Sequence, residues 1–228
     1  MVRRERLEWR VAVGSESTSA VVDRSETGDG STVFVCAHGA GGNMHDRGML
    51  AVATALGGRG LDLVRFNFLY KEKKSGRPDP MPKLGETTRA VVARVRDELN
   101  PRRLIIGGRS MGGRAASMLA AGGFDCTGLL LLAYPLHPAG KPDQLRDAHL
   151  PAIRVPVLCI NGTRDALCTP ELMERAIASV STPWRMHWLD GADHSFHVLG
   201  SSGRTDAAVM TEVADVAERW LEQLGSES

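Results

Sequence analysis

The sequence has 228 residues, of which 43% are hydrophobic and 24% are charged, a composition typical of a globular protein of one domain. The net charge of +1 gives no overall field that would attract nucleic acid or an anionic membrane surface. No apolar stretch is long enough to span a bilayer, so we expect neither nucleic acid nor a membrane among the partners.

Hydrophobic periodicity and turn residues predict strands that alternate with helices. In chain order we expect strands at 6–13, 18–23 and 31–37, a helix at 49–56, a strand at 61–68, a helix at 86–99, a strand entering Gly108, a helix at 114–121, strands at 128–133 and 156–160, a helix at 170–179, a strand at 184–189 and a helix at 207–224. This order predicts an α/β fold in a single domain spanning residues 1–228, with a mostly parallel central sheet and helices on both faces. The longest segments without a predicted element, 70–82 and 134–155, follow strands at the carboxyl edge of the sheet, where such folds bind ligands.

The chain has four cysteines, Cys36, Cys126, Cys159 and Cys168, none of them at a C-x-x-C or zinc-type spacing. Cys36 and Cys159 fall in apolar runs and are expected to be reduced and buried. Residues 1–6 contain no apolar segment of the kind found in signal peptides. These features predict a cytoplasmic protein that uses no metal and no other cofactor.

The segment Gly108-Arg109-Ser110-Met111-Gly112 is the most informative motif. An apolar strand enters this G-x-S-x-G pattern and a helix of small residues leaves it, which is the context of a nucleophile elbow. A side chain at either glycine would collide with a neighbouring strand or helix, and the tight turn lifts the Ser110 hydroxyl onto the rim of the sheet. A turn used only for packing is the alternative. Phosphate-binding loops are disfavoured, because Gly113 stands where a P-loop needs lysine and Met44 where a dinucleotide fingerprint needs glycine.

A nucleophilic serine needs a base to accept its proton and an acid to orient that base. In this architecture the three residues follow one another in the order Ser, Asp or Glu, and His. Asp165 and His194 each lie just past the end of a predicted strand, at the edge of the sheet that carries Ser110. We therefore predict Ser110, Asp165 and His194 as the catalytic residues.

Neighbouring residues are the alternatives for the acid and the base. His197 lies deeper in the same loop as His194, and Asp190 and Asp193 flank that histidine. We prefer Asp165 because it ends a separate strand and can approach the imidazole from the side away from the serine. A surface histidine and a turn or N-cap aspartate are the structural alternatives.

Acyl transfer also needs N–H donors for the oxyanion of the tetrahedral intermediate. Met111, the residue after the nucleophile, is expected to supply one of them at the positive end of the new helix. Ala40, in the loop His38-Gly39-Ala40-Gly41-Gly42, is expected to supply the second, with Gly39 as the fallback. His38 is expected to pack under this loop, for which a flexible turn is the alternative. The predicted substrate contacts are Gly39, Arg109 and Tyr134.

These motifs together resemble the α/β-hydrolase superfamily. The resemblance rests on residues 38–42, 108–112, 165 and 191–194, and the stretch Tyr134-Pro135-Leu136-His137-Pro138-x-Gly140-Lys141-Pro142 is similar to one in a small lidless branch related to dienelactone hydrolases. Relatives in that branch include a testis-expressed protein and a chromatin-complex subunit. The similarity runs from about residue 31 to near the end of the chain, and it implies Ser110 as nucleophile, Asp165 as acid and His194 as base. Dienelactone hydrolases carry cysteine at the elbow, so the resemblance does not imply that activity here.

The sequence thus predicts a cofactor-independent serine hydrolase that cleaves small carboxylic esters through an acyl-enzyme. Only about twenty residues connect the strands at 128–133 and 156–160, which leaves no room for a large lid. A non-catalytic interaction module on the same scaffold is one alternative, and thioester or amide hydrolysis or acyl transfer by the same serine is another. We expect a small-molecule ester as partner and a monomer or homodimer.

Overall fold

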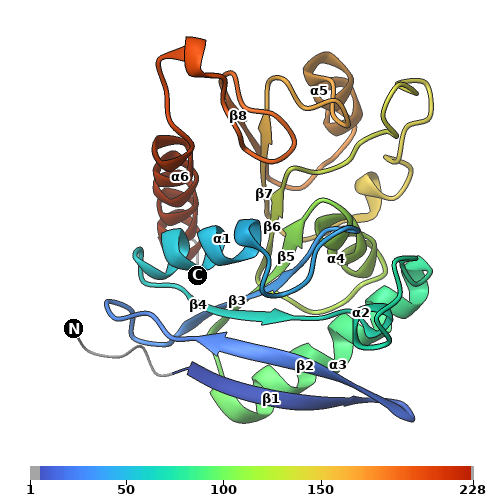
Figure 1. Ribbon diagram of the computed structural model, residues 1–228, viewed down its shortest axis with the longest axis vertical. Helices are drawn as coiled ribbons and strands as arrows, with labels where there is room; N and C mark the ends of the chain where they lie inside the picture. The colour runs from blue at the N-terminus through green and yellow to red at the C-terminus, as the bar shows by residue number, and fades with distance from the viewer. Residues whose placement is uncertain (1–5, 227–228) are drawn as a thin grey trace.

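The computed structural model of the chain describes residues 6–226 and the side chains of residues 7–224, so the prediction made for residues 1–6 lies almost wholly outside the described residues. One sheet of eight strands runs through this part of the chain, in the order β1-β2-β4-β3-β5-β6-β7-β8 (Figure 1). Its strands are β1 (Arg6–Val13), β2 (Glu16–Asp23), β3 (Thr32–Ala37), β4 (Asp62–Phe66), β5 (Arg103–Arg109), β6 (Gly128–Leu132), β7 (Val157–Gly162) and β8 (Trp184–Leu189). β1 and β2 pair antiparallel with their neighbours and all other pairs are parallel, which confirms the predicted mostly parallel sheet.

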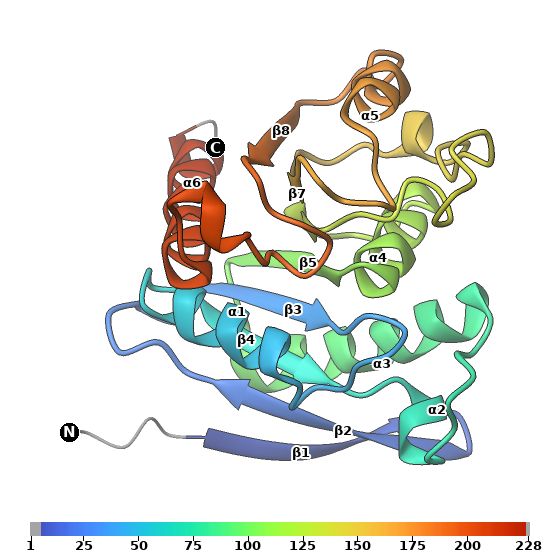
Figure 2. The same ribbon diagram turned by 45° about the horizontal axis from the view of Figure 1, so that its top comes forward.

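Helices cover both faces of the sheet (Figures 1 and 2). On one face lie α1 (Arg47–Gly57) and α6 (Asp206–Ser226), and on the other lie α3 (Met81–Leu99), α4 (Met111–Ala121) and α5 (Pro170–Ile177). A short helix, α2 (Leu69–Glu72), follows β4. Among the helices of residues 6–226, none is both long and apolar enough to cross a membrane.

The central strand β3 shows how the sequence specifies two cores. Val33, Val35 and Ala37 belong to the apolar cluster under α3 and α4, whereas Phe34 and Cys36 belong to the cluster under α1 and α6. Side chains of a strand point alternately to opposite faces, so an uninterrupted apolar run is buried on both. The prediction of reduced, buried cysteines is confirmed for Cys36 and Cys159, and the other two cysteines are also free and buried.

The largest departure from the predicted elements lies in the segment 70–82, which we expected to be a loop. α2 overlaps this segment, and α3 begins at Met81 and not at Glu86. Pro80 and Pro82 flank the first residue of α3, where proline is tolerated because its missing N–H would have no intrahelical acceptor. The apolar periodicity becomes regular only further along the helix, and for that reason its first turn was not predicted.

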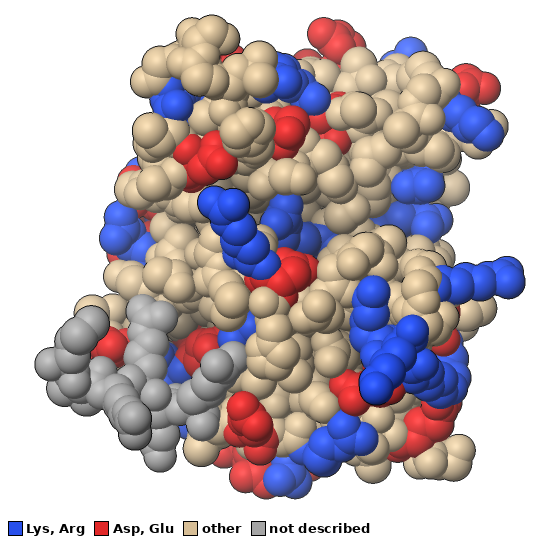
Figure 3. Space-filling view, viewed as in Figure 1, with Lys and Arg blue, Asp and Glu red and all other residues tan. Residues whose placement is uncertain are grey.

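The carboxyl ends of β3, β5 and β7 lie at one edge of the sheet, and the loop after β8 reaches across to the same edge (Figure 2). Lys, Arg, Asp and Glu side chains are interspersed over the face of the molecule drawn in Figure 3. Neither sign of charge dominates that face, in keeping with the net charge of +1.

Candidate active site

Ser110 connects β5 to α4 at the carboxyl edge of the sheet. Its backbone has φ +50° and ψ −117°, a conformation that costs a non-glycine residue about 1–3 kcal/mol and persists only where the surroundings impose it. A Cβ at Gly108 would lie 2.1 Å from the carbonyl oxygen of Ala37 in β3, and a Cβ at Gly112 would lie 2.5 Å from the same oxygen. The close approach of three backbones therefore requires glycine at both positions of the motif.

His194 bridges Ser110 and Asp165. Its Nδ1 atom lies 2.9 Å from Oδ1 and 2.8 Å from Oδ2 of Asp165, and its Nε2 atom lies 2.9 Å from Oγ of Ser110. An ionised carboxylate can only accept hydrogen bonds, so Nδ1 carries the proton and Nε2 accepts from the Ser110 hydroxyl. The structure brings together the three residues that the sequence singled out, in the order hydroxyl, imidazole, carboxylate.

The Asp165 side chain is fully buried and is held by donors besides the imidazole. Its Oδ2 accepts from Nδ2 of Asn161 at 3.2 Å, and its Oδ1 accepts from the N–H of Leu167 at 2.8 Å. Asn161 is fixed in turn by the backbone of Tyr134, with which it exchanges two hydrogen bonds of 3.0 Å. Sequence reasoning missed Asn161, whose one signal is a polar residue at the end of an apolar strand directly before the turn that carries the acid.

The alternative acid and base residues have other partners. His197 is exposed, and its Nδ1 lies 3.0 Å from the Asp206 carboxylate. The Asp193 carboxylate accepts the N–H groups of Ser195, at 2.7 Å, and of His197, at 3.0 Å. These contacts hold the turn around His194 together and favour Asp165 as its partner.

The loop after β3 is fixed from below by His38. This residue is fully buried, and its Nε2 accepts from the N–H of Phe68 at 3.2 Å, so its Nδ1 donates to the carbonyl oxygen of Gly39 at 2.7 Å. Burial lowers the pKa of His38 and keeps the imidazole neutral. A Cβ at Gly39 would lie 3.5 Å from Cβ of Ser110, so the loop runs directly beside the elbow.

The predicted oxyanion donors lie in the two segments that adjoin Ser110. Met111 is the first residue of α4, and the first N–H groups of a helix have no intrahelical acceptor. Ala40 follows Gly39, and its carbonyl oxygen accepts the Tyr70 hydroxyl at 2.7 Å. Burial raises the pKa of Tyr70 to about 12, so that this hydroxyl remains a donor. The contact holds Ala40 in place, and the use of both N–H groups remains a prediction.

The chain matches a known protein family over most of its length. A family profile described as an alpha/beta hydrolase domain matches residues 30–222. The chain belongs to the α/β-hydrolase family. Its membership confirms the predicted fold class and the resemblance on which that prediction partly rested.

Solved structures share the fold of this α/β-hydrolase at low sequence identity. A serine hydrolase homologue from Coxiella burnetii is 22% identical, with 94% of this chain and 97% of that chain covered and a TM-score of 0.76. XC6422 from Xanthomonas campestris, a serine hydrolase without a lid, is 22% identical, with 95% of each chain covered and a TM-score of 0.76. A dienelactone hydrolase from Anabaena variabilis is 20% identical, with 97% and 98% covered and a TM-score of 0.75.

The α/β-hydrolase described here has no lid domain in residues 6–226. Between β6 and β7, where a lid is usually inserted in this fold, the chain forms only the short 3₁₀ turn η1 (Leu150–Ala152) as regular structure. The prediction of a fold with a minimal lid or none is thereby confirmed, and within the described residues no inserted helical domain covers the edge that carries Ser110.

Two of the predicted substrate contacts have other partners in this α/β-hydrolase. Tyr134 is fully buried and its hydroxyl donates to the carbonyl oxygen of Arg146 at 2.9 Å, so its ring presents no surface to a substrate. Arg109 donates to the carbonyl oxygen of His194 at 3.3 Å. Gly39 lies against the elbow and remains a predicted contact.

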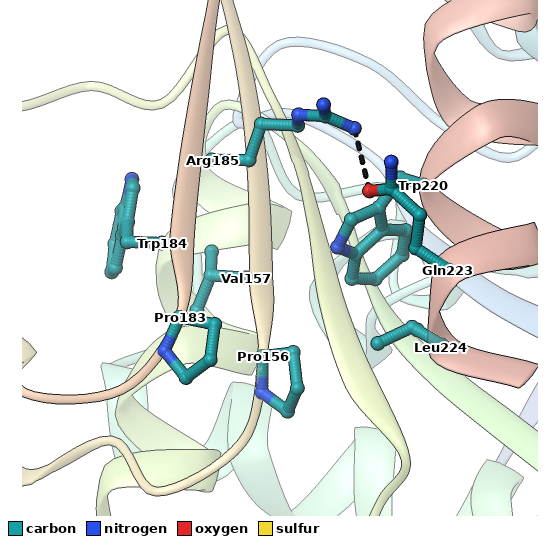
Figure 4. A pocket seen from close by; sticks show the side chains of 8 residues that line it. All are labelled: Pro156, Val157, Pro183, Trp184, Arg185, Trp220, Gln223 and Leu224. Atoms are coloured by element: carbon teal, nitrogen blue, oxygen red, sulfur yellow. Dashed lines mark hydrogen bonds between the residues drawn. The ribbon is translucent and has the colours of Figure 1, made fainter. Parts of the chain in front are cut away.

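A pocket of about 250 Å³ lies at the opposite edge of the sheet, at the amino-terminal ends of β7 and β8 beside α6 (Figure 4). Arg185 donates to Gln223 at 2.8 Å within it. The residues that line this pocket include no serine, histidine or carboxylate, so it offers no acid–base pair for hydrolysis. Over the described part of the chain, no group of three His, Cys, Asp or Glu side chains is arranged to hold a metal ion.

Proposed function

We propose that this α/β-hydrolase cleaves small carboxylic esters with Ser110 as nucleophile, His194 as general base and Asp165 as the acid that orients the base. The observation that carries the proposal is the continuous hydrogen-bond chain from the Ser110 hydroxyl through the imidazole to a buried carboxylate. Asp165 holds the tautomer whose Nε2 is free to accept the serine proton, and its charge stabilises the imidazolium that forms.

The reaction proceeds through an acyl-enzyme. Ser110 Oγ attacks the ester carbonyl carbon while His194 Nε2 takes the hydroxyl proton. The protonated Nε2 then donates to the alkoxide oxygen as the ester C–O bond breaks, and the alcohol leaves. Water next attacks the acyl carbonyl while His194 Nε2 takes its proton, and Nε2 then donates that proton to Ser110 Oγ as the acyl C–O bond breaks, which frees the carboxylic acid and regenerates Ser110.

The negative charge of each tetrahedral intermediate falls on the former carbonyl oxygen. The N–H groups of Met111 and Ala40 are the proposed donors to that oxyanion, and the positive end of α4 adds a favourable field. The backbone of Ala40 is held by the Tyr70 hydroxyl, so this donor needs no rearrangement during the reaction.

Ser110→Ala tests the proposal directly. The variant is expected to lose turnover of p-nitrophenyl acetate and labelling by a fluorophosphonate, because it lacks the hydroxyl that lies 2.9 Å from His194 Nε2. Ser195→Ala is the matched control, since Ser195 is an exposed serine next to His194. It is expected to retain wild-type turnover and labelling.

The outcomes separate the proposal from its alternatives. A wild-type protein that neither reacts with the fluorophosphonate nor hydrolyses the ester would point to an interaction module. Labelling without ester turnover would point to another acyl substrate for the same serine.

A further inference from the structure

Arg109 is the last residue of β5 and directly precedes Ser110, yet its side chain contacts a loop far along the chain. Its Nη2 donates to the carbonyl oxygen of His194 at 3.3 Å, and its guanidinium lies 5.4 Å from the ring centroid of Phe196. A cation placed in this way over an aromatic face is attracted to it. One side chain therefore holds the loop at two points, on the base itself and two residues beyond it.

The guanidinium also lies against the first turn of α1. A Cβ at Gly48, in the first turn of α1, would lie 1.8 Å from Nη1 and 3.0 Å from Cζ of Arg109. The guanidinium thus occupies space that only glycine leaves open at this position. Burial lowers the pKa of Arg109, and the charge of Asp46, which caps α1, opposes that change. Arginine stays protonated under such conditions, so the side chain retains its full set of donors.

The loop that carries His194 is held together by contacts among its own residues. The Asp193 carboxylate binds the N–H groups of Ser195 and His197, and a bridge joins Ala192 to Val198. Phe196 is buried and has φ +65°, a conformation that its surroundings must maintain. Because these contacts link residues 192–198 to one another, a displacement of the turn would also displace the imidazole of His194.

We propose that Arg109 is a positioning residue for His194: its guanidinium, seated on Gly48, fixes the turn at 193–198 against the elbow and thereby sets the distance from Nε2 to Ser110. This inference rests on the proposed function of Ser110 and His194. It replaces the sequence-based prediction that Arg109 contacts the substrate. The residue acts through the base and touches neither the ester nor the reacting oxygen.

Arg109→Ala is expected to lower kcat by about 10- to 100-fold and to leave KM within about twofold, because a displaced base slows the chemical step without removing a substrate contact. Arg109→Lys keeps the charge over Phe196 and is expected to recover part of the loss. Arg96→Ala is the matched control, since Arg96 also donates to a carbonyl oxygen, that of Asp125 at 2.6 Å, and lies 5.7 Å from a phenylalanine ring. It is expected to leave kcat unchanged.

A second variant moves the guanidinium without altering it. Gly48→Ala places a methyl group against Nη1 and is expected to lower kcat in the wild-type background, although alanine normally stabilises a helix. In the Arg109→Ala background the guanidinium is gone and the tightest contact left is one of 3.3 Å with Oδ1 of Asp46, so the methyl group is expected to have little further effect on kcat. Gly85→Ala in α3 is the matched control, because its Cβ would make an ordinary contact of 3.8 Å with Leu119.

A second measurement of the position of the base does not depend on enzymatic activity. It is the proton NMR signal of His194 Nδ1–H in the hydrogen bond to Asp165. Arg109→Ala is expected to broaden this signal through faster exchange with water, whereas Arg96→Ala is not. The inference is overturned if Arg109→Ala leaves both kcat and this signal as in the wild type, or if Gly48→Ala lowers kcat by the same factor in both backgrounds. A wild-type protein without esterase activity would contradict the proposed function alone, because the NMR signal would still decide the role of Arg109.

Discussion

The buried carboxylate of Asp165 is held by the imidazole of the proposed base and by two neighbours that take no part in the reaction. Burial of an ionised carboxylate is costly unless hydrogen-bond donors replace the lost water. The imidazole of His194, the amide of Asn161 and the N–H of Leu167 supply those donors. Each group of the site is oriented by the next, from the donors around Asp165 through His194 to the Ser110 hydroxyl.

Asp165→Asn tests which aspartate orients the base. The amide of the variant would donate to Nδ1 of His194 and stabilise the tautomer with its proton on Nε2, so kcat for p-nitrophenyl acetate is expected to fall by about 10³- to 10⁴-fold. Asp193→Asn keeps an oxygen that accepts from Ser195 and His197 and is expected to remain close to wild type. The opposite ranking of the two variants would move the acid to Asp193.

The lowered pKa of His149 is expected to make the free energy of unfolding depend on pH. Its Nε2 lies 2.8 Å from Oγ of Ser117, and burial together with the charge of Arg114, only partly offset by Asp147, lowers its pKa from 6.5 to about 4. Between these two pH values the unfolded chain binds the proton and the folded chain does not, so the free energy of unfolding falls as the pH drops through this window. Urea unfolding at pH 7 and pH 4.5 is expected to show a smaller loss for His149→Gln than for the wild type. Equal losses would exclude this contribution.

At the elbow the backbones of β5 and α4 pack closely against the end of β3. Gly112→Ala would place its methyl group 2.5 Å from the carbonyl oxygen of Ala37, so it is expected to lower the free energy of unfolding by about 1–3 kcal/mol, as overpacking does. Gly85→Ala, whose methyl group meets only a leucine side chain, is the control and is expected to be neutral or slightly stabilising. Urea unfolding of both variants measures the difference. Equal stability would mean that the elbow tolerates a side chain and that the glycine is not required.

Most elements could be predicted from the sequence because their signals are local. Apolar runs buried on both faces identify the parallel strands, and the two glycines around Ser110 are required by a close backbone approach that the motif itself encodes. The first turn of α3 was missed because prolines and a glycine interrupt its apolar pattern. The contacts of Asn161 with the backbone of Tyr134 and of Arg109 with the carbonyl oxygen of His194 could not be predicted, because they join residues 27 and 85 positions apart.

For the molecule as a whole, the edge of the sheet that carries Ser110 has no lid domain above it in the described residues. A long acyl chain gains binding energy only from an apolar surface that encloses it, and such surfaces usually come from a lid. We therefore expect kcat/KM to be highest for p-nitrophenyl acetate and butyrate and to fall for the octanoate and palmitate esters. A steady rise toward the palmitate ester, or activation above its solubility limit, would contradict an open site for small esters.

The proposed function depends on acylation of Ser110 with His194 as its base. The most direct test is mass spectrometry of peptides from enzyme quenched during turnover of p-nitrophenyl acetate, in the wild type and in the Ser110→Ala variant. We predict an acetyl group on the peptide that contains Ser110 in the wild type and unmodified peptides in the variant. Acetylation of a different residue, or undiminished turnover by the variant, would show that Ser110 is not the nucleophile.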